Sequence, residues 1–276
     1  MKFIDMHTHS TFSDGVYSPS KLVDYAVEKG LSGIAITDHD TIDGIEEAIE
    51  RANMYQDFII IPGIELSTEY NNEEVHILGY MIDYKMEYLL KILQRLQDTR
   101  NDRAIKIINK LKRQGIKINY GDVIKIAGDG VVGRPHIAHA LIKKNYVQTV
   151  REAFMKYLTK GASAYVPKQK LTPGCAVNII RKAGGFPVAA HPGLLKSEAI
   201  LDYLISLGID GIEVYHPKHT TEQSEEYLRL AKKHNLVITG GSDFHFPPKN
   251  NKHNSNPDGD LGSIKVPLES VEKLLK

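Results

Sequence analysis

The chain has 276 residues, and its 42% hydrophobic and 25% charged residues are typical of a globular protein with one or two domains. Its 35 Lys and Arg residues nearly balance 34 Asp and Glu residues. The whole chain therefore has no strong positive electrostatic field to attract nucleic acid or anionic membranes, and only a local basic patch could do so. Because no apolar run is long enough for a signal peptide or a membrane span, and the single cysteine favours a reducing compartment, we predict a cytoplasmic protein without membrane contact.

Short apolar runs alternate with amphipathic segments at both ends of the chain. This pattern predicts βα units and a largely parallel sheet or barrel. Seven runs are predicted to be buried strands, at residues 3–6, 33–37, 58–61, 75–79, 186–190, 211–215 and 236–240. Helices are expected at 19–29, 45–52, 173–183, 200–207 and 227–233. We expect a capping box at Asp43–Glu46, and we expect Cys175 to pack on its helix as a small apolar residue.

The alternation stops between residues 86 and 158, where the pattern is helical throughout. A long amphipathic stretch from Leu89 ends at Gly115, and shorter helices are predicted at 122–127, 134–143 and 149–158. We therefore expect an all-α insertion, residues 86–164, that covers the active site of a barrel formed by residues 1–85 and 165–276. The polar segment 247–259 is the best candidate for a mobile loop.

Two histidines follow the first predicted strand. His7 and His9 are two residues apart on an extended segment, so both side chains project to the same side. Asp14 follows in a Ser-Asp-Gly turn, which can bring a carboxylate oxygen near the two imidazoles. By itself the pair is equally typical of a solvated strand end, so its meaning depends on other residues.

Further histidines and carboxylates are predicted at or just beyond the carboxyl ends of strands. They are His39, Glu65, His191, His216, Asp243 and His245. The carboxyl ends of parallel strands meet on one face of a barrel, where active sites are built. Imidazoles mixed with carboxylates are typical ligands of catalytic Zn²⁺, Mn²⁺ or Fe²⁺, and the lack of cysteine ligands argues against a closed structural zinc site. The pattern predicts a catalytic metal centre.

The same residues fall into motifs that resemble those of the PHP (polymerase and histidinol phosphatase) family of metal-dependent phosphoesterases. The four motifs are His7-Thr8-His9 with Asp14, Thr37-Asp38-His39-Asp40, Ala190-His191-Pro192-Gly193 and Ser242-Asp243-Phe244-His245. Glu65 in Pro62-Gly63-Ile64-Glu65 and His76 in Val75-His76 match two additional ligands. The resemblance covers residues 1–80 and 165–245.

The resemblance implies an α/β fold, a distorted (β/α)7 TIM-like barrel with a trinuclear centre of divalent ions (Mn²⁺, Zn²⁺ or Fe²⁺). It assigns one ion to His7, His9, Glu65 and Asp243, a second to Asp14, His39 and His245, and a third to Glu65, His76 and His191. Glu65 would bridge two ions. Because the implied ligand set is complete, we expect an active enzyme.

The insertion, with Gly133–Ala138, resembles the subgroup that removes phosphate from nucleotides. The implied activity is a phosphoric monoester hydrolase acting on a nucleoside 5′-monophosphate or 3′,5′-bisphosphate, through attack by a metal-bridging hydroxide. One alternative is a 5′-3′ exonuclease on short RNA or DNA. Histidinol-phosphate phosphatase is a second, disfavoured by the insertion, and a non-catalytic, metal-stabilised binding module is a third. No obligate protein partner is evident.

Glu65, Asp14 and His216 are the predicted catalytic residues. His216 would protonate the leaving group or bind phosphate, and a structural hydrogen bond is an equal alternative. Asp38 and Asp40 would either orient His39 or cap a turn.

Substrate phosphate is expected at Arg134 and His136, which open a predicted helix whose free N–H groups and dipole favour anions. Lys168, where the chain re-enters the barrel, is a third candidate. Tyr215 could stack on a base. His139, His219, His234 and His253 are expected to be surface or packing residues.

Overall fold

The computed structural model describes residues 2–128, 132–167, 171–248 and 259–275. The chain forms two compact units, Met1–Leu90 with Lys170–Lys276, and Lys91–Gln169. The prediction divides the chain slightly earlier, after residues 85 and 164, and its statement that the helical part covers the active site stays a prediction. Within the described residues, no helix is both long and apolar enough to cross a membrane. Most of the loop expected to be mobile, 247–259, lies outside the described residues.

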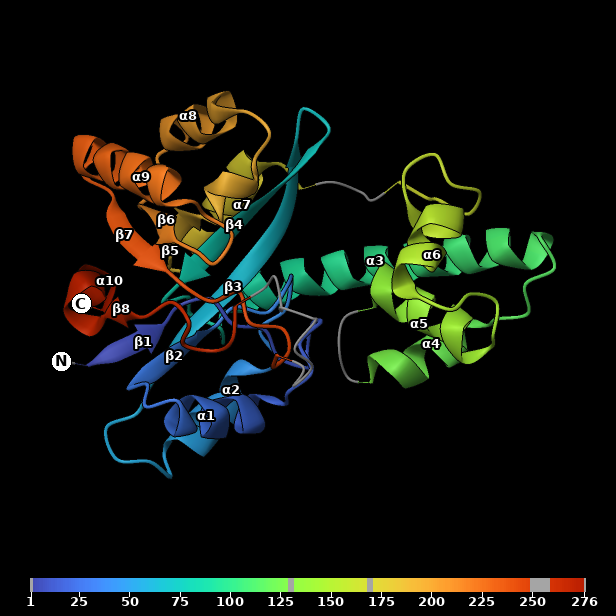
Figure 1. Cartoon of the computed structure of the whole chain (residues 1–276), viewed down its shortest axis with the longest axis horizontal. Coiled ribbons are helices and arrows are strands. Elements are labelled where there is room, and N and C mark those ends of the chain that lie inside the picture. Colours follow the sequence, from blue (N-terminus) through green and yellow to red (C-terminus); the bar gives the residue numbers. More distant parts are fainter. Residues whose placement is uncertain (1, 129–131, 168–170, 249–258, 276) are drawn as a thin grey trace. The chain divides into compact units, whose positions relative to one another are not determined.

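The first unit contains an eight-stranded sheet, and its strands are labelled in Figure 1. The strands are β1 (Phe3–Asp5), β2 (Gly33–Ile36), β3 (Ile59–Tyr70), β4 (Glu73–Tyr80), β5 (Phe186–Ala189), β6 (Gly211–Tyr215), β7 (Val237–Gly240) and β8 (Val266–Pro267). Their order is β7-β6-β5-β4-β3-β2-β1-β8. Beyond β1 and β7, the Met6 amide donates to the Gly240 carbonyl at 3.3 Å, and a parallel bridge joins Thr8 to Phe244. These contacts nearly close the sheet, and they confirm the predicted α/β barrel.

Two features of the sheet differ from the prediction. β4 pairs antiparallel with both β3 and β5, and the short β8, which was not predicted, pairs antiparallel with β1. β3 continues well past residue 61 because it forms a hairpin with β4. Asn71 and Asn72 connect the two strands, and both have positive φ angles, a conformation that asparagine tolerates and that tight hairpin turns require.

Helices flank the sheet of the first unit. They are α1 (Pro19–Glu28), α2 (Ile45–Ala52), α7 (Pro173–Lys182), α8 (Glu198–Ser206), α9 (Thr221–His234) and α10 (Glu272–Leu275), with short 3₁₀ turns η2 (Pro192–Leu194) and η3 (Leu268–Val271). The predicted capping box at Asp43–Glu46 is wrong, because α2 begins after Gly44, which has no side chain to cap it. Cys175 lies on α7 but is exposed, so its predicted packing is also wrong.

The second unit is helical, as predicted. It comprises most of α3 (Glu87–Arg113), then α4 (Tyr120–Ala127), α5 (Arg134–Lys143), α6 (Val150–Ala153) and a π-helical turn, η1 (Phe154–Leu158). The unit has its own hydrophobic core, in which Leu111, Leu141 and Leu158 are fully buried. A separate apolar cluster, with Ile4, Leu78 and Val188 among its members, lies in the sheet of the first unit. Each unit therefore has its own apolar interior.

Candidate metal centre

The predicted metal ligands gather at one end of the barrel. His7 and His9 follow β1, His39 follows β2, Glu65 and His76 lie within β3 and β4, His191 follows β5, and Asp243 and His245 follow β7. Glu65 was expected at the end of a strand. It lies instead inside β3, because the hairpin with β4 extends that strand beyond the ligand position.

Two β-bridges fix the positions of these side chains relative to one another. The His9 amide donates to the Phe244 carbonyl at 2.9 Å, and the Phe244 amide donates to the His7 carbonyl at 3.3 Å. Thr8 pairs with Phe244. Side chains alternate along an extended chain, so the neighbours of Thr8, His7 and His9, point to the same face as the neighbours of Phe244, Asp243 and His245. A second bridge pairs His39 with Glu65.

Backbone conformations next to the centre are unusual. His191 and Asp243 have φ angles of 27° and 52°, in a region that residues other than glycine seldom occupy. Such strain persists only where the surrounding structure holds it, and it is concentrated at functional sites. Gly15 is required for a different reason, since a Cβ atom there would lie 2.1 Å from the His9 carbonyl oxygen. The turn that contains Asp14 therefore packs so closely against the His9 carbonyl that only glycine fits at position 15.

The first group of converging atoms comes from four side chains. Nε2 of His7 lies 3.4 Å from Oε2 of Glu65 and 3.5 Å from Oδ1 of Asp243. Nε2 of His9 lies 3.4 Å and 3.2 Å from the same two oxygens. Two imidazole nitrogens and two carboxylate oxygens thus lie close together. His7, His9 and Asp243 among them could hold a divalent cation.

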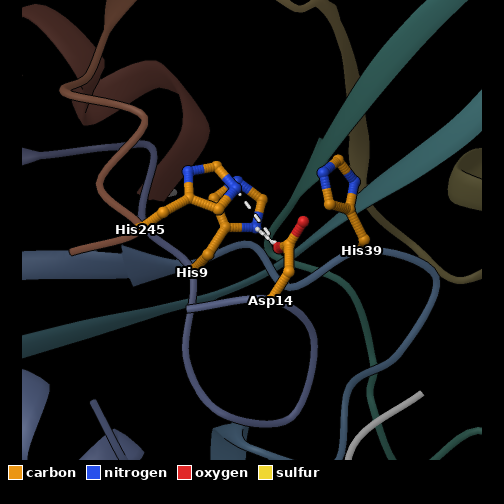
Figure 2. Close-up of side chains that lie close together, drawn as sticks. All are labelled: His9, Asp14, His39 and His245. Carbon is orange, nitrogen blue, oxygen red and sulfur yellow. Dashed lines mark ion pairs between the residues drawn. The ribbon is translucent and has the colours of Figure 1, made fainter. Parts of the chain in front are cut away.

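A second group contains Asp14, His39 and His245, with His9 beside them (Figure 2). Nε2 of His245 lies 3.2 Å from Oδ1 of Asp14, and Nδ1 of His9 lies 3.8 Å from the same oxygen. The rings of His9 and His245 are stacked with centroids 4.2 Å apart. His9 therefore borders both the first and second groups.

The third group is arranged around Oε1 of Glu65. Nδ1 of His76 lies 2.9 Å from this oxygen, and Nε2 of His191 lies 3.0 Å from it. Nδ1 of His39 lies 2.9 Å from the other oxygen of Glu65. Glu65 thus contacts side chains of all three groups, which is the position expected of a bridging carboxylate.

Burial and spacing both fit metal ions at this place. His7, His9 and Glu65 are fully buried, yet Nε2 of both histidines and Oε2 of Glu65 have no hydrogen bond. Leaving buried polar atoms unpaired is costly. Ligand atoms about 2.1 Å from a shared ion lie roughly 3.0 to 3.4 Å apart. The separations around the first group match this spacing, so the residues present fit a cation.

The charged side chains at the centre shift one another's pKa values. Burial alone would raise the pKa of Glu65, but the positive charges of His39, His76 and His7 outweigh it and hold this pKa well below its usual value. Burial would lower the pKa of His76, but Glu65 raises it to about 10. Burial would likewise lower the pKa of His245, and Asp14 raises it to about 9. The carboxylates are therefore ionised at neutral pH and favour cations beside them.

His9 behaves in the opposite way. Burial, together with the positive charge of His245, lowers the pKa of His9 to about 4. Its imidazole is therefore neutral at neutral pH, which is the form that binds metal ions.

Sequence analysis missed one carboxylate that holds the ligands. Glu213, fully buried on β6, accepts a hydrogen bond from Nδ1 of His7 at 3.0 Å and another from the His191 amide at 2.6 Å. The signal was present, because Glu213 is a charged residue within the apolar run Gly211–Tyr215. Such a residue is seldom fully buried without a partner.

The carboxylate of Asp38 holds a turn, whereas that of Asp40 binds the backbone of β3. Asp38 accepts hydrogen bonds from the Ser10 amide and hydroxyl, both at 2.7 Å, and from the Ser13 hydroxyl. Asp40 accepts one from the Ser67 amide at 2.8 Å. These contacts favour the turn-capping alternative for Asp38, which fixes the turn between His9 and Asp14.

His216 lies beside the first group. Its Nδ1 accepts a hydrogen bond from the Lys218 amide at 3.2 Å, so the proton is on Nε2, which lies 3.4 Å from Oδ2 of Asp243. This contact would orient the Asp243 carboxylate. His219 also packs locally, between the Val214 carbonyl and the Gly193 amide, as expected. Tyr215, the residue proposed to stack on a base, is 40% exposed.

The expected phosphate-binding residues belong to the helical unit or lie outside the described residues. Arg134 begins α5, and its guanidinium lies 5.4 Å from the centroid of the Phe154 ring and 3.4 Å from the Leu158 carbonyl oxygen. Nδ1 of His136 accepts a hydrogen bond from the Gly133 amide at 3.1 Å. Lys168 lies outside the described residues. Phosphate binding by these residues stays a prediction.

Comparison with known proteins identifies relatives along nearly the whole chain. A 5′-3′ exoribonuclease of Haemophilus influenzae is 37% identical over 252 residues, which cover 89% of this chain and 91% of that protein. A 3′,5′-nucleoside bisphosphate phosphatase of Chromobacterium violaceum is 33% identical over 90% of this chain and 88% of that protein. A crystal structure from Bifidobacterium adolescentis, provisionally named a metal-dependent phosphoesterase, has a TM-score of 0.83 and 32% identity, covering 99% of this chain and 95% of that one.

The PHP domain model matches residues 5–169, which is more than half of the chain. This match confirms the resemblance that the His7-Thr8-His9 motif and the related motifs indicated. The chain belongs to the PHP domain family and is a metal-dependent phosphoesterase.

Proposed function

We propose that the protein hydrolyses a phosphomonoester of a nucleotide, a nucleoside 5′-monophosphate or 3′,5′-bisphosphate. The observation that carries this proposal is the convergence of buried, unpaired imidazole nitrogens and carboxylate oxygens around Glu65. The Chromobacterium violaceum relative, a 3′,5′-nucleoside bisphosphate phosphatase, supports the substrate class.

Three divalent ions are proposed, and the ligand sets carried over from the family are supported by the three groups. The first would use His7, His9, Glu65 and Asp243, the second Asp14, His39 and His245, and the third Glu65, His76 and His191. Divalent ions held here would supply an activated water and neutralise the phosphoryl oxygens. Mn²⁺, Zn²⁺ and Fe²⁺ all suit this donor set.

The chain's own residues would position the substrate. Glu65 would hold the groups together as a bridge, and Asp14 would anchor the second group. His216 carries its proton on Nε2 beside Asp243, so it could donate a hydrogen bond to a phosphoryl oxygen of the substrate. Arg134, His136 and Lys168 are the proposed phosphate-binding residues.

A 5′-3′ exonuclease acting on short oligonucleotides is the second candidate. The Haemophilus influenzae exoribonuclease, similar along 89% of this chain, favours it. Both activities use the same phosphate-ester chemistry, and they differ in whether the substrate is one nucleotide or the end of a strand.

The test is phosphate release from a panel of substrates in the presence of Mn²⁺. The panel contains nucleoside 5′-monophosphates, 3′,5′-bisphosphates, histidinol phosphate and 5′-phosphorylated oligomers whose shortening is followed separately. We expect metal-dependent release from a nucleotide. Preferred turnover of oligomers to mononucleotides would establish the exonuclease instead, and no metal-dependent turnover of any substrate would refute both.

A further inference from the structure

The two units carry opposite charge, although the whole chain is nearly neutral. The helical unit, Lys91–Gln169, contains 17 Lys and Arg residues and 5 Asp and Glu residues, whereas the rest of the chain contains 18 and 29. An anionic polymer is therefore repelled by the protein charge of the barrel unit and attracted by the helical unit. The net charge of the whole chain conceals this difference.

One face of α3 concentrates the positive charge around a cavity of about 300 Å³. Lys106, Asn109, Lys110 and Arg113 line it, and their spacing places them on one side of the helix. The row from Lys106 to Arg113 extends about 10 Å along the helix axis, enough to follow more than one phosphate of a strand. No acidic residue lines this cavity, as far as the described residues show. We call this feature the basic groove.

The walls of the basic groove are fixed by hydrogen bonds. Nζ of Lys110 donates to the Tyr165 carbonyl at 2.6 Å, and Nε of Arg103 donates to the Val166 carbonyl at 2.9 Å. Val166 and Pro167 thereby form an apolar wall opposite the cationic row. Among the described residues, no ion pair or hydrogen bond is found for the side chains of Lys106 and Arg113, so both charges are available to a ligand.

We propose that the basic groove binds the sugar–phosphate backbone of a single-stranded oligonucleotide. Its cations would contact phosphates, and Val166 with Pro167 would contact a ribose or base. Cationic grooves that follow the backbone are the common means of binding single strands. A concave site fits a strand better than a flat lipid surface. This inference rests on the second candidate of the proposed function, the exonuclease, because an enzyme that acts on strand ends needs contacts with the rest of the strand.

The experiment measures binding of the full-length, Mn²⁺-loaded protein to a fluorescent single strand of about 12 nucleotides with hydrolysis-resistant phosphorothioate linkages. The test variant is Lys106→Gln/Arg113→Gln, which retains good helix-forming residues. Each phosphate contact to a single strand contributes about 0.7 to the slope of log K against log salt. Loss of two contacts should lower the slope by about 1.4 and weaken binding about 25-fold at 0.1 M salt.

The matched control is Lys112→Gln/Lys143→Gln, which removes two exposed charges of the same unit outside the basic groove. It should bind the strand within about 2-fold of the wild type, because its phosphate contacts are intact. Equal weakening in both variants would overturn the proposal, since binding would then follow net charge alone. Binding of the wild type to phosphatidylserine vesicles but not to the strand would also overturn it. Mn²⁺-dependent shortening of unmodified 5′-phosphorylated oligomers by the wild type tests the exonuclease function independently of this binding assay.

Discussion

Nδ1 of His7 and the carboxylate of Glu213 lie 3.0 Å apart, and both side chains are fully buried. An ionised carboxylate can only accept hydrogen bonds, so Nδ1 of His7 is protonated and donates a hydrogen bond to Glu213. The other ring nitrogen, Nε2, faces Glu65 and Asp243, so it is the atom of His7 that would bind a metal ion. The second oxygen of Glu213 accepts from the His191 amide at 2.6 Å, so one carboxylate holds two proposed ligands.

Glu213→Gln should reduce metal affinity, because the amide loses the charge that fixes the His7 tautomer. Partners of this kind typically contribute 10- to 100-fold, so we expect about that loss, with phosphate release partly restored by excess Mn²⁺. The measurement is metal content after dialysis, together with the Mn²⁺ dependence of turnover. Glu225→Gln, at an exposed position of α9, is the control. Identical Mn²⁺ curves for Glu213→Gln and the wild type would show that Glu213 has no such role.

The sequence predicted the ligands better than it predicted their supports. His7 and His9 could be predicted from one short segment. Alternate residues of a strand point to the same side, and active sites of barrels lie at the carboxyl ends of the strands. Glu213 was missed because its partners, His7 and His191, are distant in sequence and meet it only across the sheet. Asp5 was missed for the same reason, since its carboxylate accepts hydrogen bonds from the Ser242 and Gly262 amides.

The fold shows the same limit. The seven predicted strands exist, but a local apolar run does not show whether its neighbour is parallel or antiparallel. The direction of β4 was set by the hairpin at Asn71 and Asn72, a turn signal that the prediction did not use. Placement of Glu65 inside β3 followed from that hairpin.

Asp14→Ala and His191→Ala should each abolish phosphate release while leaving the fold largely intact. Each removes a donor from one of the proposed groups, so we expect a loss of at least about 100-fold. The Asp14 side chain is 35% exposed, so its removal opens no cavity in the apolar core. Turnover is measured with saturating Mn²⁺, and circular dichroism reports the fold. Asp57→Ala, at a carboxylate that is 72% exposed, is the control, and full turnover by Asp14→Ala would contradict the ligand assignment.

Leu111→Ala and Ile105→Ala compare a buried and an exposed position on α3. Leu111 is fully buried in the core of the helical unit, whereas Ile105 is 40% exposed. Leu111→Ala should lower the free energy of unfolding of this unit by about 2 to 5 kcal/mol, and Ile105→Ala by less than about 1 kcal/mol. Hydrogen exchange in the helical unit measures both effects. Equal exchange rates in the two variants would mean that α3 does not pack as described.

The last prediction concerns an ion pair between α1 and α2. Nε and one terminal nitrogen of Arg51 donate to the two oxygens of Asp24, at 2.6 and 2.9 Å, and the Tyr55 hydroxyl donates to the same carboxylate. The hydrogen bond from Arg51 is the main cause that lowers the pKa of Asp24 from 3.8. Because the folded state prefers ionised Asp24, the pair stabilises the fold above the unfolded pKa. That stabilisation disappears as the pH falls through the lower pKa of the folded state.

Wild type and Asp24→Asn should therefore differ in free energy of unfolding at pH 7 and converge toward pH 3. The side chains of Asp24 and Arg51 are 34% and 31% exposed, so solvent screens the pair and the difference at pH 7 should not exceed about 1 kcal/mol. Urea unfolding at a series of pH values measures it, and raising the ionic strength should reduce it. Asp202→Asn, at an exposed position of α8, is the matched control and should show no such convergence. A difference that grows toward low pH would have the wrong sign for an ion pair with a lowered carboxyl pKa.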